Sequence, residues 1–262
     1  MEGVDEVQVV SAVKYVNDDL LQADFRSNGY VIVSDGLNLD VLRYARDSLA
    51  RGIEILGYPR PPGVDVQDFI DPTIIGLNAT RSGQDELYSL HEGLRKLSVW
   101  CGLVADSALL AARCVGNENP FSVVSWGFLL GLPDDSRLAY DFHQETSYMV
   151  GAGDIMNVHF PFLRPSTIEN GTMSVLEGSH REGVLETDRS KVSDNSYTNM
   201  VPKRINELKS KYREVAFHLE LGDIALFHKD LVHKSNPNLS SALRPPAVFR
   251  LTQDLRYGFT KS

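Results

Sequence analysis

EVAFHLELGDIALFH, residues 214–228, contains two short β-type runs that meet at the turn Gly222-Asp223. Apolar and β-branched residues bounded by glycine and aspartate are typical of a strand followed by a tight turn. Five further runs of this kind are FSVVSWGFLL (121–130), LAYDFHQETSY (138–148), DIMNVHFPFL (154–163), TMSVLEG (172–178) and AVFRLTQDLRY (247–257). Seven short strands separated by turns predict a mainly β fold, a sandwich or jelly-roll barrel.

Residues 1–120 are expected to be mainly helical and to support this core, with one strand at YVIV, residues 30–33. Apolar residues recur at helical spacing over 7–20 and again over 85–115, where they predict one long helix or two abutting helices. Four prolines between residues 59 and 72 predict a loop over 57–72, because proline interrupts regular elements.

A polar segment, 186–196, interrupts the predicted strands, and a helix is expected from Pro202 to Lys211. This insertion, near 186–212, is expected to form a lid or a surface loop. No linker or internal repeat divides the chain. We therefore expect a single domain over 1–262, with helical support over 1–120 and the barrel over 121–262.

The composition excludes several classes of protein. Hydrophobic residues make up 42% of the chain and its net charge is −9, so we expect a globular protein that repels nucleic acid and anionic membranes. No apolar run is long enough to span a bilayer, and the first ten residues, MEGVDEVQVV, lack the features of a signal peptide. Cys101 and Cys114, expected to be buried, make no disulfide framework, which favours a cytoplasmic protein.

The segment DFHQE, residues 141–145, carries the most informative chemistry. His143 and Glu145 are two residues apart, so on an extended strand they share a face. A third ligand can come from LGDIALFHKDLVHKSNPN, residues 221–238, which offers His228 and His233. Two histidines and one carboxylate on one face of a metal leave positions open, as in non-haem Fe(II) oxygenases. Those positions suit a chelating keto acid and O₂.

An arginine near this site fits a keto acid that has a second carboxylate. Arg244 follows His233 by eleven residues. Its planar, permanently charged guanidinium suits a carboxylate better than a lysine does.

The chain from about residue 20 to the end resembles the phytanoyl-CoA dioxygenase (PhyH) family of Fe(II)/2-oxoglutarate oxygenases. The family pattern has a His-x-Asp/Glu pair, a distal histidine and an arginine eleven residues later, matched in order by His143, Glu145, His233 and Arg244. Weaker matches are Phe25–Val31, Asn170-Gly171, Glu177-Gly178-Ser179-His180 and Gly222-Asp223.

The resemblance implies a double-stranded β-helix, a cupin-like jelly roll, with His143, Glu145 and His233 as the ligands of Fe(II). It implies that Arg244 and Ser235 hold 2-oxoglutarate as co-substrate, and it indicates no catalytic side chain beyond the metal ligands. The implied reaction uses O₂ to hydroxylate an unactivated C–H bond of a small-molecule metabolite or natural-product intermediate, and releases succinate and CO₂.

One departure from the family pattern bears on the reaction. Glu145 stands where many members have aspartate. Halogenating relatives lack this carboxylate, so its presence disfavours halogenation.

Other residues near the motif have two interpretations each. Tyr148, Asn157 and His159 are candidate substrate-binding residues, although core packing explains them equally well. Arg250 can line the site, although a surface salt bridge is the simpler interpretation.

Asp141 can orient His143 or lie exposed at a strand end, and His228 is interpreted as structural or as a neighbour of the ligands. Two alternative functions remain open: a non-catalytic jelly-roll protein that binds a metabolite, and a cupin-type metal-dependent hydrolase or isomerase.

Overall fold

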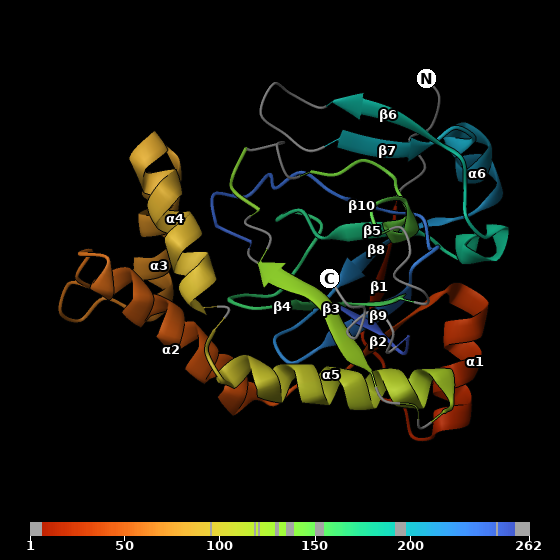
Figure 1. Ribbon diagram of the computed structural model, residues 1–262, viewed down its shortest axis with the longest axis horizontal. Helices are drawn as coiled ribbons and strands as arrows, with labels where there is room; N and C mark the ends of the chain where they lie inside the picture. Colours follow the sequence, from red (N-terminus) through yellow and green to blue (C-terminus); the bar gives the residue numbers. More distant parts are fainter. Residues whose placement is uncertain are drawn as a thin grey trace, which may run out of the picture.

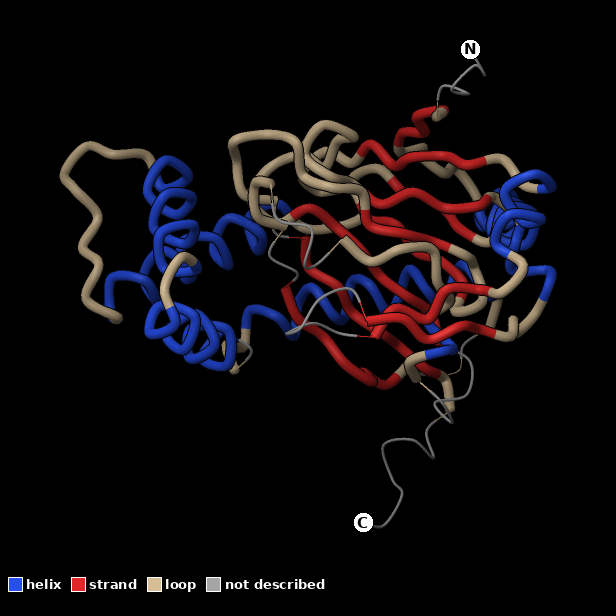
Figure 2. Tube along the Cα trace, turned by 90° about the horizontal axis from the view of Figure 1, so that it is seen from above, coloured by secondary structure: helices blue, strands red, loops and turns tan. Residues whose placement is uncertain are grey.

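The computed structural model describes residues 7–94, 96–117, 119, 121–128, 131–134, 139–149, 155–191, 198–244 and 246–254. Two facing sheets form the body of the protein, and helices lie along one side and at both ends of it (Figures 1 and 2). The five-stranded sheet has the order β2 (Tyr30–Val33), β9 (Ile224–His228), β4 (Ile155–Pro161), β11 (Pro246–Thr252) and β3 (Ser122–Phe128). The four-stranded sheet has the order β1 (Gln8–Ser11), β8 (Glu214–His218), β5 (Met173–Leu176) and β10 (His233–Ser235).

Apart from the parallel pair β1–β8, the strands within both sheets pair antiparallel. Strands that are neighbours in a sheet come from distant parts of the sequence. For example, β4 lies between β9 and β11. Two facing sheets with these crossovers form a jelly roll, and the predicted fold class is confirmed.

Alternation along the strands divides the five-stranded sheet into two faces. On β4, Val158 and Phe160 point outward into a large cluster that includes residues of α2 (Leu39–Ile55), α3 (Val66–Asn78) and α5 (Val99–Val115). On β9, Ala225 and Phe227 point inward and join a second cluster between the sheets. We call the side of this sheet that carries Ala225, Phe227 and their same-face neighbours the inner face.

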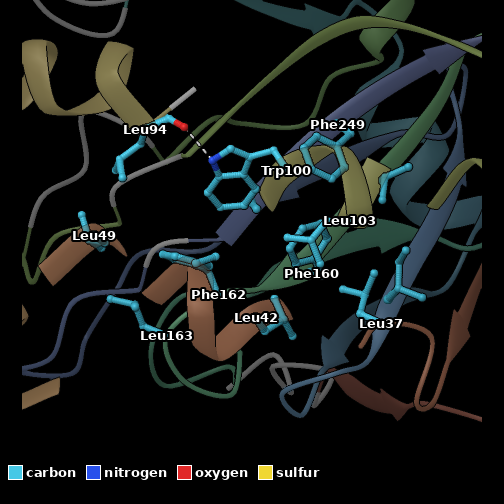
Figure 3. Packing of buried hydrophobic residues seen from close by; sticks show 14 of the residues in the cluster. Leu37, Leu42, Leu49, Leu94, Trp100, Leu103, Phe160, Phe162, Leu163 and Phe249 are labelled. Atoms are coloured by element: carbon cyan, nitrogen blue, oxygen red, sulfur yellow. Dashed lines mark hydrogen bonds between the residues drawn. The ribbon is translucent and has the colours of Figure 1, made fainter. Parts of the chain in front are cut away.

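The large cluster attaches the helices to the barrel. Trp100 of α5 is 3% exposed, and its indole Nε1 donates to the carbonyl of Leu94 at 2.7 Å, at the end of α4 (Arg81–Leu94) (Figure 3). The Trp100 ring lies 5.5 Å from the ring of Phe162. The sequence prediction that Trp100 is a core residue is confirmed, whereas the side chain of Trp126 lies outside the described residues.

The sequence predictions for the helical half are partly wrong. Residues 7–20 do not form one helix: Gln8–Ser11 is β1, paired with β8, and α1 (Asp18–Asn28) begins after Asn17, whose side chain accepts from the Leu20 amide. A strand partner more than 200 residues away in the sequence (Gln8 opposite Val215) cannot be inferred from local periodicity.

The predicted loop over 57–72 ends earlier, because α3 begins at Val66. Asp65 caps this helix through an acceptor bond from the Gln67 amide at 2.8 Å, and the exposed Pro72 lies within the helix. The stretch 85–115 forms two helices, α4 and α5, which agrees with the second of the two alternatives. Gly102 lies inside α5 and does not break it.

The insertion near 186–212 contains a hairpin. Its strands are β6 (Thr187–Lys191) and β7 (Thr198–Pro202), and α6 (Ile205–Lys211) follows, close to the predicted helix. The predicted strand over 138–148 is wrong. In its place, His143 makes a single bridge and Glu145–Ser147 form the 3-10 turn η2. A second 3-10 turn, η3, spans Ser179–Glu182.

The two cysteines are both free, but only one is buried as predicted. Cys114 is buried in α5, where desolvation raises the pKa of its thiol to about 12. Cys101 is exposed, so the expectation for it is wrong. Among the described helices, none taken singly is long and apolar enough to cross a membrane; α4 and α5 meet that test only as a pair bent by 67°.

Truncation of Phe160 to alanine is expected to lower the free energy of unfolding by about 3–5 kcal/mol. Phe160 is fully buried and its ring lies 5.3 Å from that of Phe249, so its removal leaves a void between sheet and helices. Chemical denaturation measures the change. Tyr88→Ala, at a position 68% exposed, is the control and should change stability little; equal effects would contradict the assigned core.

Candidate metal centre

His143 and His233 are held next to each other by the backbone. The amide of each donates to the carbonyl of the other at 2.9 Å, and their rings lie 4.2 Å apart. His233 begins β10, whereas His143 lies in the segment that precedes η2. This one bridge joins two parts of the motif that are 90 residues apart in the sequence.

Both imidazoles are oriented in the same way. The Nδ1 of His143 lies 2.7 Å from the carbonyl oxygen of Asp141, and the Nδ1 of His233 lies 2.8 Å from that of Leu231. A carbonyl only accepts, so each Nδ1 carries the proton and each Nε2 has a free lone pair. Burial lowers the pKa of both rings, so they are neutral at pH 7 and available as metal ligands.

Glu145 joins His143 and His233, and we call these three residues the metal group. One ligand atom from each of His143, Glu145 and His233 lies within 4.8 Å of the other two, and all three residues are buried. Glu145 reaches this place from the 3-10 turn η2, so the convergence predicted for an extended strand is achieved by a different backbone conformation. Two neutral imidazoles and a carboxylate fit a divalent transition metal such as Fe(II).

Arg250 supports the carboxylate of this group. Its Nε donates to Glu145 Oε1 at 2.5 Å, and its Nη1 donates to the Ser125 hydroxyl at 3.3 Å. The side chains of Arg250 and Glu145 are 26% and 6% exposed. The interpretation of Arg250 as a surface salt bridge is therefore wrong, because its partner is a residue of the metal group.

Replacement of Arg250 by methionine is expected to weaken metal binding about 10–100-fold, the range found when partners of metal ligands are removed. Glu145 would lose its charged partner and the hydrogen bond that fixes its orientation. Competition with a chelating indicator measures the affinity. Arg213→Met, which removes a similar ion pair with Glu177 away from the site, should leave it unchanged. Unchanged affinity in Arg250→Met would contradict this role.

The sequence prediction gave no supporting role to two further residues that hold the segments of the candidate ligands. Gln144, fully buried, donates to the carbonyls of Gly183 and Asp230 at 2.8 and 2.7 Å and accepts from the Leu185 amide at 2.9 Å. The Ser179 hydroxyl accepts from the amide of Val232, next to His233, at 2.9 Å. The signals available in the sequence were the position of Gln144 between His143 and Glu145 and the match of Ser179 to a turn of the family.

Arg244 is buried close to the inner face. Its amide and carbonyl pair with those of Gly131 at 2.9 Å, and a Cβ on Gly131 would lie 3.2 Å from the Arg244 Nε, so a larger residue there would crowd the guanidinium. Burial lowers the pKa of Arg244 to about 10, so it remains charged at pH 7. Its Nε is buried with no hydrogen-bond partner, and no described carboxylate lies within ion-pair distance of Arg244.

Arg164 links the backbone next to Arg244 to the helical half by a hydrogen bond and an ion pair. Arg164 donates to the carbonyl of Leu243 and pairs with Asp71 of α3. The helices therefore support the segment that carries Arg244, in addition to covering the sheet.

The other predicted site residues are placed as follows. Ser235 lies two residues after His233 on β10, on the same face of that strand, and is partly buried. The Tyr148 ring packs against His143 at 5.4 Å, and its hydroxyl accepts from the Met200 amide of β7 at 3.1 Å. Asn157 and His159 are buried on the inner face of β4.

Two residues with open interpretations are now placed. Asp141 is exposed and orients His143 through its backbone carbonyl, while its carboxylate accepts from the Phe142 amide. His228 is outside the metal group; its ring packs against those of Phe25 and His180, at 6.5 and 5.5 Å. The structure therefore favours His233 over His228 as the third member of the group.

Comparison with known proteins gives the family of the chain. The phytanoyl-CoA dioxygenase (PhyH) family matches residues 25–245. The 1-deoxypentalenic acid 11-beta-hydroxylase of Streptomyces arenae is 25% identical over 246 residues, which cover 91% of this chain and 80% of that protein.

Among solved structures, the epimerase SnoN in complex with Fe³⁺, alpha-ketoglutarate and nogalamycin RO matches with a TM-score of 0.60 and 16% identity, over 90% of this chain and 83% of SnoN. EctD from S. alaskensis with bound Fe matches with a TM-score of 0.59 and 18% identity, over 95% and 82%. At these identities the two structures show the same fold. Since the family match spans most of the sequence, the chain belongs to the phytanoyl-CoA dioxygenase (PhyH) family.

Proposed function

We propose that the protein is a non-haem oxygenase that depends on Fe(II) and 2-oxoglutarate, and that the whole chain forms one catalytic domain. The observation that carries this proposal is the buried group of His143, Glu145 and His233, with ligand atoms within 4.8 Å of one another. The expected reaction is the hydroxylation of a C–H bond in a small molecule, with release of succinate and CO₂.

The proposed roles follow from the chemistry of each residue. His143 and His233 bind the metal through Nε2, and Glu145 binds it through a carboxylate oxygen that Arg250 orients. Arg244 binds the distal carboxylate of 2-oxoglutarate, and Ser235 on β10 donates a second hydrogen bond to it. The bound iron supplies the oxidising chemistry, whereas the chain supplies orientation and a site with little water.

A natural-product intermediate is the preferred substrate class. The matched hydroxylase acts, by its name, on 1-deoxypentalenic acid, and the SnoN complex contains nogalamycin RO. The Tyr140 and Tyr148 rings lie 5.6 and 5.4 Å from the His143 ring. Aromatic side chains beside the metal group suit a largely apolar substrate. The carboxylate of Glu145 disfavours halogenation, as the sequence predicted.

Turnover of 2-oxoglutarate in the absence of a substrate tests the proposal. Purified protein with Fe(II), ascorbate and 2-oxoglutarate is expected to form succinate and to consume an equal amount of O₂ above the uptake of a protein-free mixture of iron and ascorbate. A metal-dependent hydrolase or isomerase would not need O₂, and a non-catalytic binding protein would form no succinate. Chelator-treated protein is the control, and succinate formation that does not depend on both iron and O₂ would contradict the proposal.

A further inference from the structure

Strand registers place two rows of side chains across the inner face. In the first row, Asn157 of β4 lies between Phe227 of β9 and Arg250 of β11. Residues directly opposite each other in antiparallel strands point to the same side. The Phe227 ring lies 4.9 Å from that of His233, and Arg250 donates to Glu145. Both neighbours of Asn157 thus contact residues of the metal group, which places the amide beside the metal centre.

The second row passes through His159, two residues further along β4. Its opposite residues are Ala225 and Val248. Burial, together with the positive charge of the nearby Arg244, lowers the pKa of His159 to about 3. His159 is therefore neutral at pH 7 and can donate one hydrogen bond without adding charge.

Two side chains in these rows, and Arg244 beside the second row, have buried polar atoms with no partner. Asn157 is 0% exposed and neither Nδ2 nor Oδ1 makes a hydrogen bond. His159 is 4% exposed with Nε2 unpartnered, and Arg244 is 6% exposed with Nε unpartnered. Buried polar atoms are rarely left unsatisfied, so a polar molecule is expected to contact these rows.

The spacing of the two rows indicates which molecule this is. Positions two apart on a strand are separated by about 7 Å. This separation is comparable to the span between the two carboxylates of extended 2-oxoglutarate, whose keto acid end must lie at the metal. The row of Asn157 adjoins the metal group, and the row of His159 adjoins the cation expected to bind the distal carboxylate.

We propose that Asn157 and His159 are both binding residues for 2-oxoglutarate: the Asn157 amide contacts its keto acid end, and His159 Nε2 donates to its distal carboxylate beside Arg244. This inference rests on the proposed function and replaces the hypothesis that the two residues face the substrate. β4 then selects a co-substrate with a second carboxylate at the correct distance.

Equilibrium binding of two keto acids to the Co(II)-loaded protein, without O₂, tests the proposal. The probes are 2-oxoglutarate and 2-oxobutyrate, which keeps the keto acid end but lacks the distal carboxylate. His159→Phe should weaken 2-oxoglutarate binding about 10–100-fold and leave 2-oxobutyrate binding unchanged. Asn157→Leu should weaken the binding of both. His159→Gln, which restores a donor, should recover part of the affinity for 2-oxoglutarate.

His218→Phe, at a half-buried position outside the site, and Asn117→Leu, at an exposed one, are the matched controls. Thermal melting and cobalt stoichiometry verify that each variant is folded and loaded. Loaded His159→Phe and Asn157→Leu variants that bind 2-oxoglutarate like the wild type would overturn this inference alone. Failure of the loaded wild-type protein to bind 2-oxoglutarate would overturn the proposed function itself.

Discussion

Replacement of His143 by alanine is expected to abolish metal binding at the site, together with 2-oxoglutarate-dependent succinate formation. Even the loss of a residue that supports a ligand weakens metal binding about 10–100-fold, so loss of a ligand should exceed a hundredfold. His143 is buried, and its Nε2 is free because Nδ1 is bound to the Asp141 carbonyl. Metal content after dialysis and chelator competition measure the loss.

The same experiment distinguishes the two candidate third ligands. His233→Ala should behave like His143→Ala, whereas His228→Ala should retain the metal, because His228 packs against Phe25 and His180 outside the metal group. His218→Ala, at a half-buried position where the ring pairs with Glu220 outside the metal group, serves as the control. Undiminished metal binding in a variant that lacks both His143 and His233 would contradict the site.

Replacement of Arg244 by alanine is expected to lower the affinity for 2-oxoglutarate by about 2–5 kcal/mol, the cost of removing one partner of a buried, hydrogen-bonded ion pair. Arg244 is 6% exposed and has no partner carboxylate among the described residues, so its charge is available to the co-substrate. Arg244→Lys keeps the charge but loses the planar fork, and should show an intermediate loss.

Isothermal titration of the metal-loaded variants measures both losses. Metal affinity should stay at the wild-type value, because Arg244 does not contact the metal group in the described structure. Arg213→Ala, at the surface pair with Glu177, is the matched control. An Arg244→Ala variant that binds 2-oxoglutarate as tightly as the wild type would show that another cation receives the distal carboxylate.

Much of the barrel could be predicted from local patterns. The runs that became β4, β5, β8, β9 and β11 are rich in β-branched and aromatic residues and end at clear turns. The segment 7–20 misled the prediction, because its valines recur at intervals compatible with a helix. Its first residues form β1 through pairing with β8, a contact that only the tertiary structure supplies.

The candidate ligands were predictable because their identity depends on residue type and order, and His143, Glu145 and His233 do meet. Their geometry was not. Glu145 approaches from a 3-10 turn, a conformation stabilised by Thr146, whose hydroxyl donates to Asp230 at 2.5 Å. That bond spans 84 residues, and no local spacing encodes it.

The role of Arg250 was misjudged for a related reason. Arg250 alternates with apolar residues along β11, and this sequence pattern is the same whether the arginine faces solvent or the interior. Only the register of β11 against β4, which sets Arg250 opposite Asn157, places it on the inner face with Glu145.

Anaerobic titration of the Fe(II)-loaded protein with 2-oxoglutarate tests the central claim most directly. If His143, Glu145 and His233 leave adjacent metal positions open for a keto acid, a weak visible absorption band should appear and saturate at one 2-oxoglutarate per iron. The band should be absent from His143→Ala and should need far more 2-oxoglutarate in Arg244→Ala. A wild-type protein that binds one iron but develops no band would contradict the account.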